Sequence, residues 1–324
     1  MARAEFTGVS GSTATPSSVR GMEPRATLLP VVTVEDIPPH PSAGDLLRRA
    51  ILLSVEPLIR HDPVIRLDKD PEGVHKARVA TRRLRSHLRT FGTLVESGWA
   101  GSLRSELDWH GSVLGPARDA DVLLRRMQNR VAKLSEAEAQ AAAEVLDSLA
   151  EARAGSHQEL IEAMNGERYA RLLERLASAA REPRLTREAD RPARTALPMV
   201  SKRWRSLRRR VKRSGLPPTD AELHRIRISA KRCRYAAEVV EPIRGKSARA
   251  FARAAADLQT ELGEHNDSVV ARRWLHGWAA GRPGHAAFAA GVLAAGESAS
   301  ARDVRRRWRK TWKTLGRKRP STWD

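Results

Sequence analysis

The chain has 324 residues, of which 41% are hydrophobic, so it can bury a substantial core within one large or two modest domains. It contains 59 lysines and arginines against 38 acidic residues, and the formal net charge of +21 predicts an anionic partner: nucleic acid, acidic lipid or a phosphate polymer. Cys233 is the single cysteine, which excludes an intramolecular disulfide or a cysteine-based zinc site and favours the reducing cytoplasm.

The stretch before Gly44, residues 1–43, is rich in Ser, Thr, Gly and Pro and predicts a disordered leader. It lacks the continuous apolar run of a signal peptide, and no later window approaches the roughly 20 apolar residues of a membrane-spanning helix. From Gly44 onward Ala, Leu, Arg and Glu dominate, with short Gly and Pro punctuation, which is typical of successive helices. Few segments alternate with the period of a strand, so we expect an all-α fold.

An internal repeat divides the helical region. The segment HKARVATRRLR at residues 75–85 matches HRIRISAKRCR at residues 224–234, displaced by 224 − 75 = 149 positions. A second pair, LGPARDADV from Leu114 and LGEHNDSVV from Leu262, is displaced by 262 − 114 = 148 positions. Two matches in the same order at nearly the same displacement indicate two homologous helical halves.

We expect each half to contain four helices: a leading helix, the basic helix, a third that ends at Leu-Gly and a fourth that opens at the following Arg-Asp or Asn-Asp pair. Residues 136–181 are rich in Ala and Glu and predict a helical connector, and residues 300–319 predict a basic C-terminal helix. The expected boundaries are therefore 44–135 for the first half, 136–181 for the connector, 192–316 for the second half and 317–324 for a basic tail.

Each repeated segment places its cations on one side of a helix. Steps of 3 and 4 residues confine them to an arc of roughly 80°. The predicted stripes comprise His75, Arg78, Arg82, Arg85 and Arg89 in the first copy and His224, Arg227, Lys231 and Arg234 in the second. A separate face is largely apolar and is predicted to be buried: Ala77, Thr81, Leu84, Leu88 and Phe91, with Ile226, Ala230, Cys233 and Ala237 in the second copy.

Like charges on successive turns repel, so two such stripes favour an offsetting multivalent anion. The planar fork of arginine suits phosphate oxygens, and the arrangement requires no sequence-specific contact. The cations of a single basic helix are more often solvated or neutralised by neighbouring carboxylates. Because the stripe occurs twice, we favour a bound anion. His75 and His224 begin the stripes, where they could contact phosphate or be structural. Asp119 and Asp267 follow the Leu-Gly pairs, and we expect them to cap a helix or orient an arginine.

Further cations could widen this basic surface. Trp204, Trp308 and Trp312 lie among them, where they could stack on bases but are more often packing anchors. The additional basic residues are Lys76, Arg83, Lys202, Arg205, Arg209, Arg225, Arg232, Arg305 and Arg309.

The paired H-x-x-R-x-x-x-[RK]-R-x-R segments and paired LG-x-x-[RN]-D segments resemble the CHAD domain, the conserved histidine α-helical domain, over residues 44–316. This resemblance implies two pseudo-symmetric four-helix bundles around a basic central channel that binds inorganic polyphosphate, and association with polyphosphate granules. It implies ligand contact by the stripe residues His75 to Arg85 and His224 to Arg234. The second half carries Asn266 and Glu238 where the first has Arg118 and Arg89, so the channel need not be symmetric. Many relatives carry a CYTH domain with an E-x-E-x-K signature before the CHAD domain, and since none is found before Gly44 we expect a stand-alone binding domain.

Three alternatives stay open beside polyphosphate binding. The phosphates of a nucleic-acid duplex would also bind a basic stripe. The stripes contain little Asn or Gln and no aromatic residue that could recognise bases, so the main alternative is non-specific DNA or RNA binding. An enzyme of phosphate chemistry is not favoured because the sequence has no H-E-x-x-H, Walker loop or acidic metal cluster, and we expect no cofactor and no metal. The segment from Arg305 to Arg319 could attract an acidic membrane or a partner protein.

Overall fold

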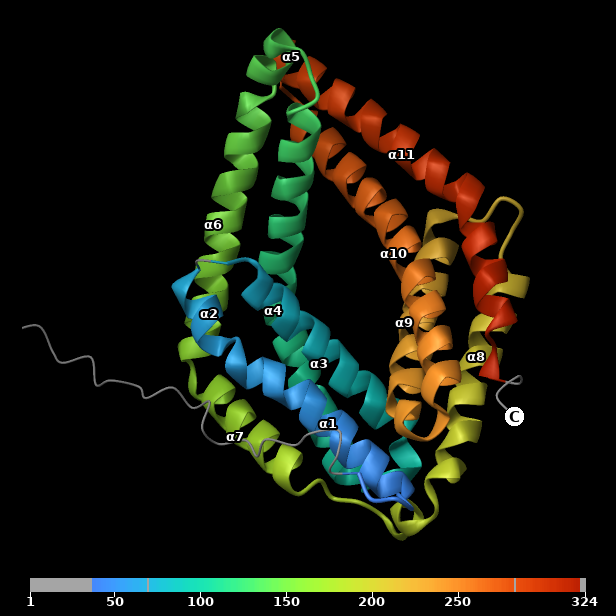
Figure 1. Cartoon of the computed structure of the whole chain (residues 1–324). Coiled ribbons are helices and arrows are strands. Elements are labelled where there is room, and N and C mark those ends of the chain that lie inside the picture. Colours follow the sequence, from blue (N-terminus) through green and yellow to red (C-terminus); the bar gives the residue numbers. More distant parts are fainter. Residues whose placement is uncertain (1–36, 69, 283, 321–324) are drawn as a thin grey trace, which may run out of the picture.

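The computed structural model describes residues 37–68, 70–282 and 284–320, so most of the expected leader lies outside the described residues. These ranges form helices and contain no strand, only two isolated bridges, and the all-α expectation is confirmed. Figure 1 shows long helices arranged around an open centre, with α4 and α6 on one side and α10 and α11 on the other. The α-helices are α1 Ala43–Arg60, α2 Asp62–Leu67, α3 Glu72–Thr90, α4 Ser97–Val131, α5 Glu136–Ala141, α6 Ala143–Asn165, α7 Glu167–Arg181, α8 Leu197–Lys212, α9 Asp220–Val239, α10 Glu241–Ala279 and α11 Gly284–Arg317.

Two hydrophobic cores hold these helices together. The larger core joins α1, α3, α4 and α7 to α8, α9 and the first part of α10, so it spans both halves of the sequence. The smaller core lies where α4, α5 and α6 meet the later part of α10 and the start of α11, at the top of Figure 1. The expected division into two four-helix bundles stays a prediction, and these cores show that the halves share their interior.

The two repeated basic segments lie on α3 and α9, and their predicted apolar faces are buried. Leu84, Leu88, Ile226 and Cys233 are each no more than 1% exposed. The start of α9 is fixed by a capping box, in which the Thr219 hydroxyl accepts from the Glu222 backbone N–H at 3.2 Å and the Glu222 carboxylate accepts from the Thr219 N–H at 2.7 Å. The stripe and its buried face thus begin at a defined register.

The expectation that helices end at the Leu-Gly pairs is wrong. The helix α4 runs without interruption through Leu114 and Pro116, and α10 runs through Leu262 and Gly263. Leu114 and Leu262 are fully buried in the larger core, so packing on both sides of the Leu-Gly pair holds one continuous helix despite the proline. Consequently Asp119 and Asp267 cannot cap a helix N-terminus.

The connector between the halves is helical, as predicted. It comprises α5, α6 and α7, of which α6 packs along α4 and α7 packs against α1. The basic C-terminal helix is the last part of α11, which begins much earlier than expected, at Gly284. Within the part of the chain that the structure describes, no helix is long and apolar enough to cross a membrane.

Candidate polyanion-binding site

The helices α3 and α9 pack against each other and bring the inner parts of both basic stripes together. Burial lowers the pKa of the Lys231 amine to about 6, and the positive charges of Arg227, Arg82 and Arg78 add to this effect. Burial also lowers the pKa of Arg227; Asp267 opposes this shift, while Arg82 and Arg78 reinforce it. Cations from sequence segments about 150 positions apart therefore repel one another across the interface between α3 and α9.

Three of these cations have no carboxylate partner. Within the described ranges Arg82, Arg227 and Lys231 form no ion pair, although each is half-buried. The Nε atoms of Arg82 and Arg227 are buried without a hydrogen-bond partner. A charge removed from water without compensation costs several kcal/mol, so this trio weakens the free protein unless an anion joins it. We call Arg82, Arg227 and Lys231 the unpaired trio.

Other stripe arginines are held in place by carboxylates. The Arg78 Nη1 donates to Asp119 at 2.5 Å and to the Gly115 carbonyl at 3.2 Å. The Arg85 guanidinium lies 2.6 Å from Asp108. Of the two roles expected for Asp119, capping a helix or orienting an arginine, these contacts agree with the second. Asp267 has a pKa raised by burial and partly restored by Arg227, which gives the second half a comparable carboxylate beside its arginine.

The end of the second stripe is paired in the same way. The Arg234 Nε donates to Glu238 at 2.8 Å, and Arg83 of α3 reaches the same carboxylate at 3.1 Å. Glu238 occupies the place that corresponds to Arg89, so this departure between the halves replaces a cation with a group that neutralises two of them. Arg89 itself is exposed and has no carboxylate partner among the described residues.

The two histidines have different neighbours. Burial lowers the pKa of His75, and the nearby charge of Arg118 adds to the shift. His224 Nδ1 lies 2.6 Å from the Asn266 carboxamide oxygen, which only accepts hydrogen bonds, so Nδ1 carries the proton. Asn266 occupies the position that corresponds to Arg118 in the first half. His224 therefore has a carboxamide as its neighbour, whereas His75 has a cation.

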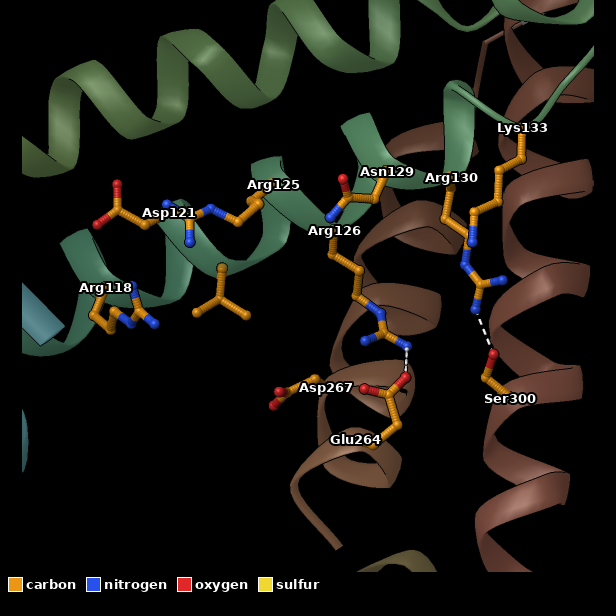
Figure 2. A pocket seen from close by; sticks show the side chains of 11 residues that line it. Arg118, Asp121, Arg125, Arg126, Asn129, Arg130, Lys133, Glu264, Asp267 and Ser300 are labelled. Carbon is orange, nitrogen blue, oxygen red and sulfur yellow. Dashed lines mark hydrogen bonds and ion pairs between the residues drawn. The ribbon is translucent and has the colours of Figure 1, made fainter. Parts of the chain in front are cut away.

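A cavity of about 490 Å³ is lined by residues of α4, α10 and α11 (Figure 2). It is also lined by Arg118 and Arg125 of α4 and by Lys133 just after α4, none of which forms an ion pair within the described ranges. Asp267 of α10 lines the same cavity and lies beside Arg227, which joins the cavity to the unpaired trio. The sequence analysis did not assign these α4 cations to the site.

Two arginines at the far end of the cavity are fully paired. Arg126 donates to Glu297 at 2.6 Å and to Glu264 at 2.8 Å, and Arg130 donates to Glu297 at 2.9 Å. Glu297 is fully buried, and it ties α4 to α11. Burial disfavours the charged form of Arg126, but its hydrogen bonds to the Glu264 and Glu297 carboxylates outweigh this effect and raise the pKa of Arg126. These arginines are structural.

The additional basic residues divide into exposed and occupied groups. Lys76, Lys202 and Arg205 are exposed. Arg305 pairs with Asp220 and the Pro218 carbonyl, and Arg309 lies 5.2 Å from the Trp308 ring centroid. Arg209 lies on α8, and Arg225 and Arg232 lie on α9; Arg209 and Arg225 are exposed, and Arg232 is half-buried. Trp308 is fully buried and Trp204 stacks on Trp312 at 5.1 Å, so these tryptophans are packing anchors.

No group of three His, Cys, Asp or Glu side chains that could hold a metal ion occurs among the described residues.

A family model described as the CHAD domain matches residues 49–276. The chain belongs to the CHAD domain family. The solved CHAD domain from the plant Ricinus communis superposes with a TM-score of 0.69 at 27% identity, covering 86% of this chain and 92% of that chain. PptA from Streptomyces chartreusis gives the same TM-score at 24% identity, covering 84% of this chain and 99% of that one, which supports the fold.

Two relatives of this CHAD domain protein are the uncharacterized proteins MT2285 and Rv2226 of Mycobacterium tuberculosis. Each is 33% identical over 270 residues, which make up 79% of this chain and 50% of the relative. The chain thus spans about half the length of these curated relatives.

Proposed function

We propose that this CHAD domain binds inorganic polyphosphate along α3, α9 and the cavity beside α4. The observation that carries the proposal is the unpaired trio: three half-buried basic side chains from two helices, none of which forms an ion pair among the described residues although Asp267 lies beside Arg227. A linear phosphate chain would place a negative charge beside each of the three side chains. Its oxygens would accept hydrogen bonds from the guanidinium groups of Arg82 and Arg227. The ligand thus removes an electrostatic cost already present in the free protein.

The shape of the site favours polyphosphate over nucleic acid, which is the alternative. The trio is half-buried, and the adjoining cavity of about 490 Å³ admits a single chain of phosphates more readily than a duplex. The stripes present guanidinium groups, which bind phosphate, and few side chains that could recognise the edge of a base. Non-specific nucleic-acid binding would use the exposed cations outside the cavity, such as Lys202 and Arg205.

The proposal is binding without chemical turnover. Three of the carboxylates that border the site are engaged by an arginine: Asp119 by Arg78, Asp121 by Arg153 and Glu264 by Arg126. We assign these three carboxylates to positioning cations. We further propose that polyphosphate binding recruits the protein to polyphosphate granules in the cytoplasm.

The test is calorimetric titration with long-chain polyphosphate of a triple variant, Arg82→Gln, Arg227→Gln and Lys231→Gln. Loss of three charge-assisted contacts should weaken binding roughly 1,000-fold or more, since each is typically worth about 1.5–3 kcal/mol. The variant should still fold, because the replaced charges are unpaired in the free protein.

A matched control removes the same charge from exposed positions of α11: Arg302→Gln, Lys310→Gln and Lys313→Gln. The control should lose only a few-fold in affinity through the general field of the protein. Equal losses in the two variants would show that net charge alone drives binding. Duplex DNA and single-stranded RNA, matched for phosphate, should bind more weakly and with steeper salt dependence than polyphosphate.

A further inference from the structure

A second basic groove lies between α8 and the start of α9, separate from the cavity beside α4. Its volume is about 340 Å³, and four arginines line it, together with two serines and one carboxylate, Glu222. The four are Arg209, Arg210, Arg213 and Arg225. In Figure 1, α8 lies beside α9 at the right of the view, and the groove residues Arg209, Arg213 and Arg225 are exposed, so the groove is open to solvent.

The arginines of this groove are not neutralised by the protein. Within the described ranges none of the four forms an ion pair, and the Nε of Arg210 is buried without a hydrogen-bond partner. Glu222 is occupied elsewhere: its carboxylate accepts from the backbone N–H of Thr219 at 2.7 Å and of Gly215 at 3.2 Å. The Thr219 hydrogen bonds lower the pKa of Glu222, so it remains charged while capping α9. The groove therefore presents an uncompensated positive charge.

Neighbouring cations connect this groove to the end of the α3 stripe. Burial lowers the pKa of Arg232, and the nearby charges of Arg89, Arg203, Arg210 and Arg85 add to the shift. Arg85 and Arg89 belong to the stripe, whereas Arg210 lines the groove. Arg232 is thus influenced by the charges of both.

The position of one of these linking residues is fixed by α3 itself. Arg203 of α8 donates to the Thr90 hydroxyl at 3.0 Å and to the Arg89 carbonyl at 2.9 Å. These bonds join α8 to the last turn of α3. The groove and the stripe therefore lie on helices that are hydrogen-bonded to each other.

We propose that the groove between α8 and α9 binds a further segment of the same phosphate chain, after the chain leaves the α3 stripe past Arg85, Arg89 and Arg232. This inference rests on the proposed function. It makes the site longer than the cavity, so that short chains fill the inner part and long chains also occupy the groove. Affinity should then increase with chain length through the added segment, because its binding is intramolecular once the inner segment is held.

The experiment compares tripolyphosphate with long-chain polyphosphate on the full chain. In the groove variant Arg209→Glu, Arg213→Glu and Arg225→Glu, all three replaced side chains are exposed, so folding should be retained and circular dichroism should match the wild type. Affinity for long chains should fall about tenfold or more, and the slope of log affinity against log salt should become shallower by about 2. Affinity for tripolyphosphate should fall no more than in the matched α11 control, through the general field of the protein alone. The matched control is Arg302→Glu, Lys310→Glu and Lys313→Glu on α11.

Each other outcome overturns the inference. An unchanged affinity for long chains, or a loss no larger than in the α11 control, would mean that the groove does not contact the chain. Equal losses for both ligands would mean that the groove does not add a separate segment. A larger loss for duplex DNA than for long polyphosphate would assign the groove to nucleic acid. Failure of the proposed function has a different signature: the triple variant of the unpaired trio would bind both polyphosphates normally.

Discussion

The arginines of α4 and those of the α3–α9 interface are alike in residue type and differ in their partners. Arg126 and Arg130 converge on the buried Glu297, and hydrogen bonds raise the pKa of Arg126 in spite of burial. Arg82 and Arg227 have no such carboxylate, and burial lowers the pKa of both. The comparison shows that burial alone does not separate these two groups of arginines; the presence or absence of an ion pair does.

The largest effect is expected where a paired arginine loses its carboxylate. Glu297→Gln leaves Arg130 without an ion pair and Arg126 with Glu264 alone. Removing one partner of a buried pair typically costs about 3–5 kcal/mol. Urea unfolding followed by circular dichroism measures this loss. The control Glu56→Gln breaks an exposed pair with Arg60 and should cost at most about 0.5 kcal/mol. If both variants were equally stable, the division between structural and unpaired arginines would have no energetic basis.

The basic helices could be predicted from the sequence because helix geometry fixes them. Spacing of 3 and 4 residues placed Leu84 and Leu88 on the buried face and Arg78 and Arg82 on the stripe, and the structure agrees for the buried face. That the two stripes meet depends on the packing of α3 against α9, which the family resemblance implied and the spacing could not. The pairing of Arg83 with Glu238 lies across that same interface.

The α4 part of the site was missed because Leu-Gly-Pro was interpreted as the end of a helix. On one continuous helix, Arg118, Arg125 and Asn129 follow steps of 7 and 4 residues and share a face, and Lys133 follows just after the helix ends. That signal was present in the sequence, but it requires a helix that runs through Pro116. Glu297 forms the ion pairs that distinguish Arg126 and Arg130 from the unpaired arginines. It lies more than 160 residues from both in the sequence, and no local pattern connects them.

An intermediate effect is expected on proton uptake at Lys231. Its amine has a pKa lowered to about 6, so in the free protein it is mostly neutral at pH 7.5, whereas a bound phosphate chain raises the pKa and protonates it. Binding should therefore take up about one proton near pH 7.5 and fewer below about pH 5.5, where the amine is already charged, and affinity should decrease as pH rises. Calorimetry in buffers of different ionisation enthalpy measures the uptake.

Two variants separate Lys231 from the other titrating groups. Lys231→Arg keeps its charge and should bind at pH 7.5 without this proton. Lys231→Met should also bind without it, about tenfold more weakly through loss of one charged contact. If the wild type took up no more protons than Lys231→Arg, the amine would already be charged in the free protein and the cost assigned to the unpaired trio would be too high.

The smallest effect is expected at Arg83, the sequence neighbour of Arg82. Arg83 pairs with Glu238, which Arg234 also holds, so Arg83→Gln leaves no carboxylate without a partner. It should change polyphosphate affinity less than about twofold and stability by at most about 1 kcal/mol, whereas Arg82→Gln should cost about tenfold in affinity. Titration of the two single variants under one set of conditions gives the comparison. Since both substitutions remove one positive charge from adjacent positions of α3, equal losses would mean that polyphosphate responds to the charge of the helix and not to the missing carboxylate.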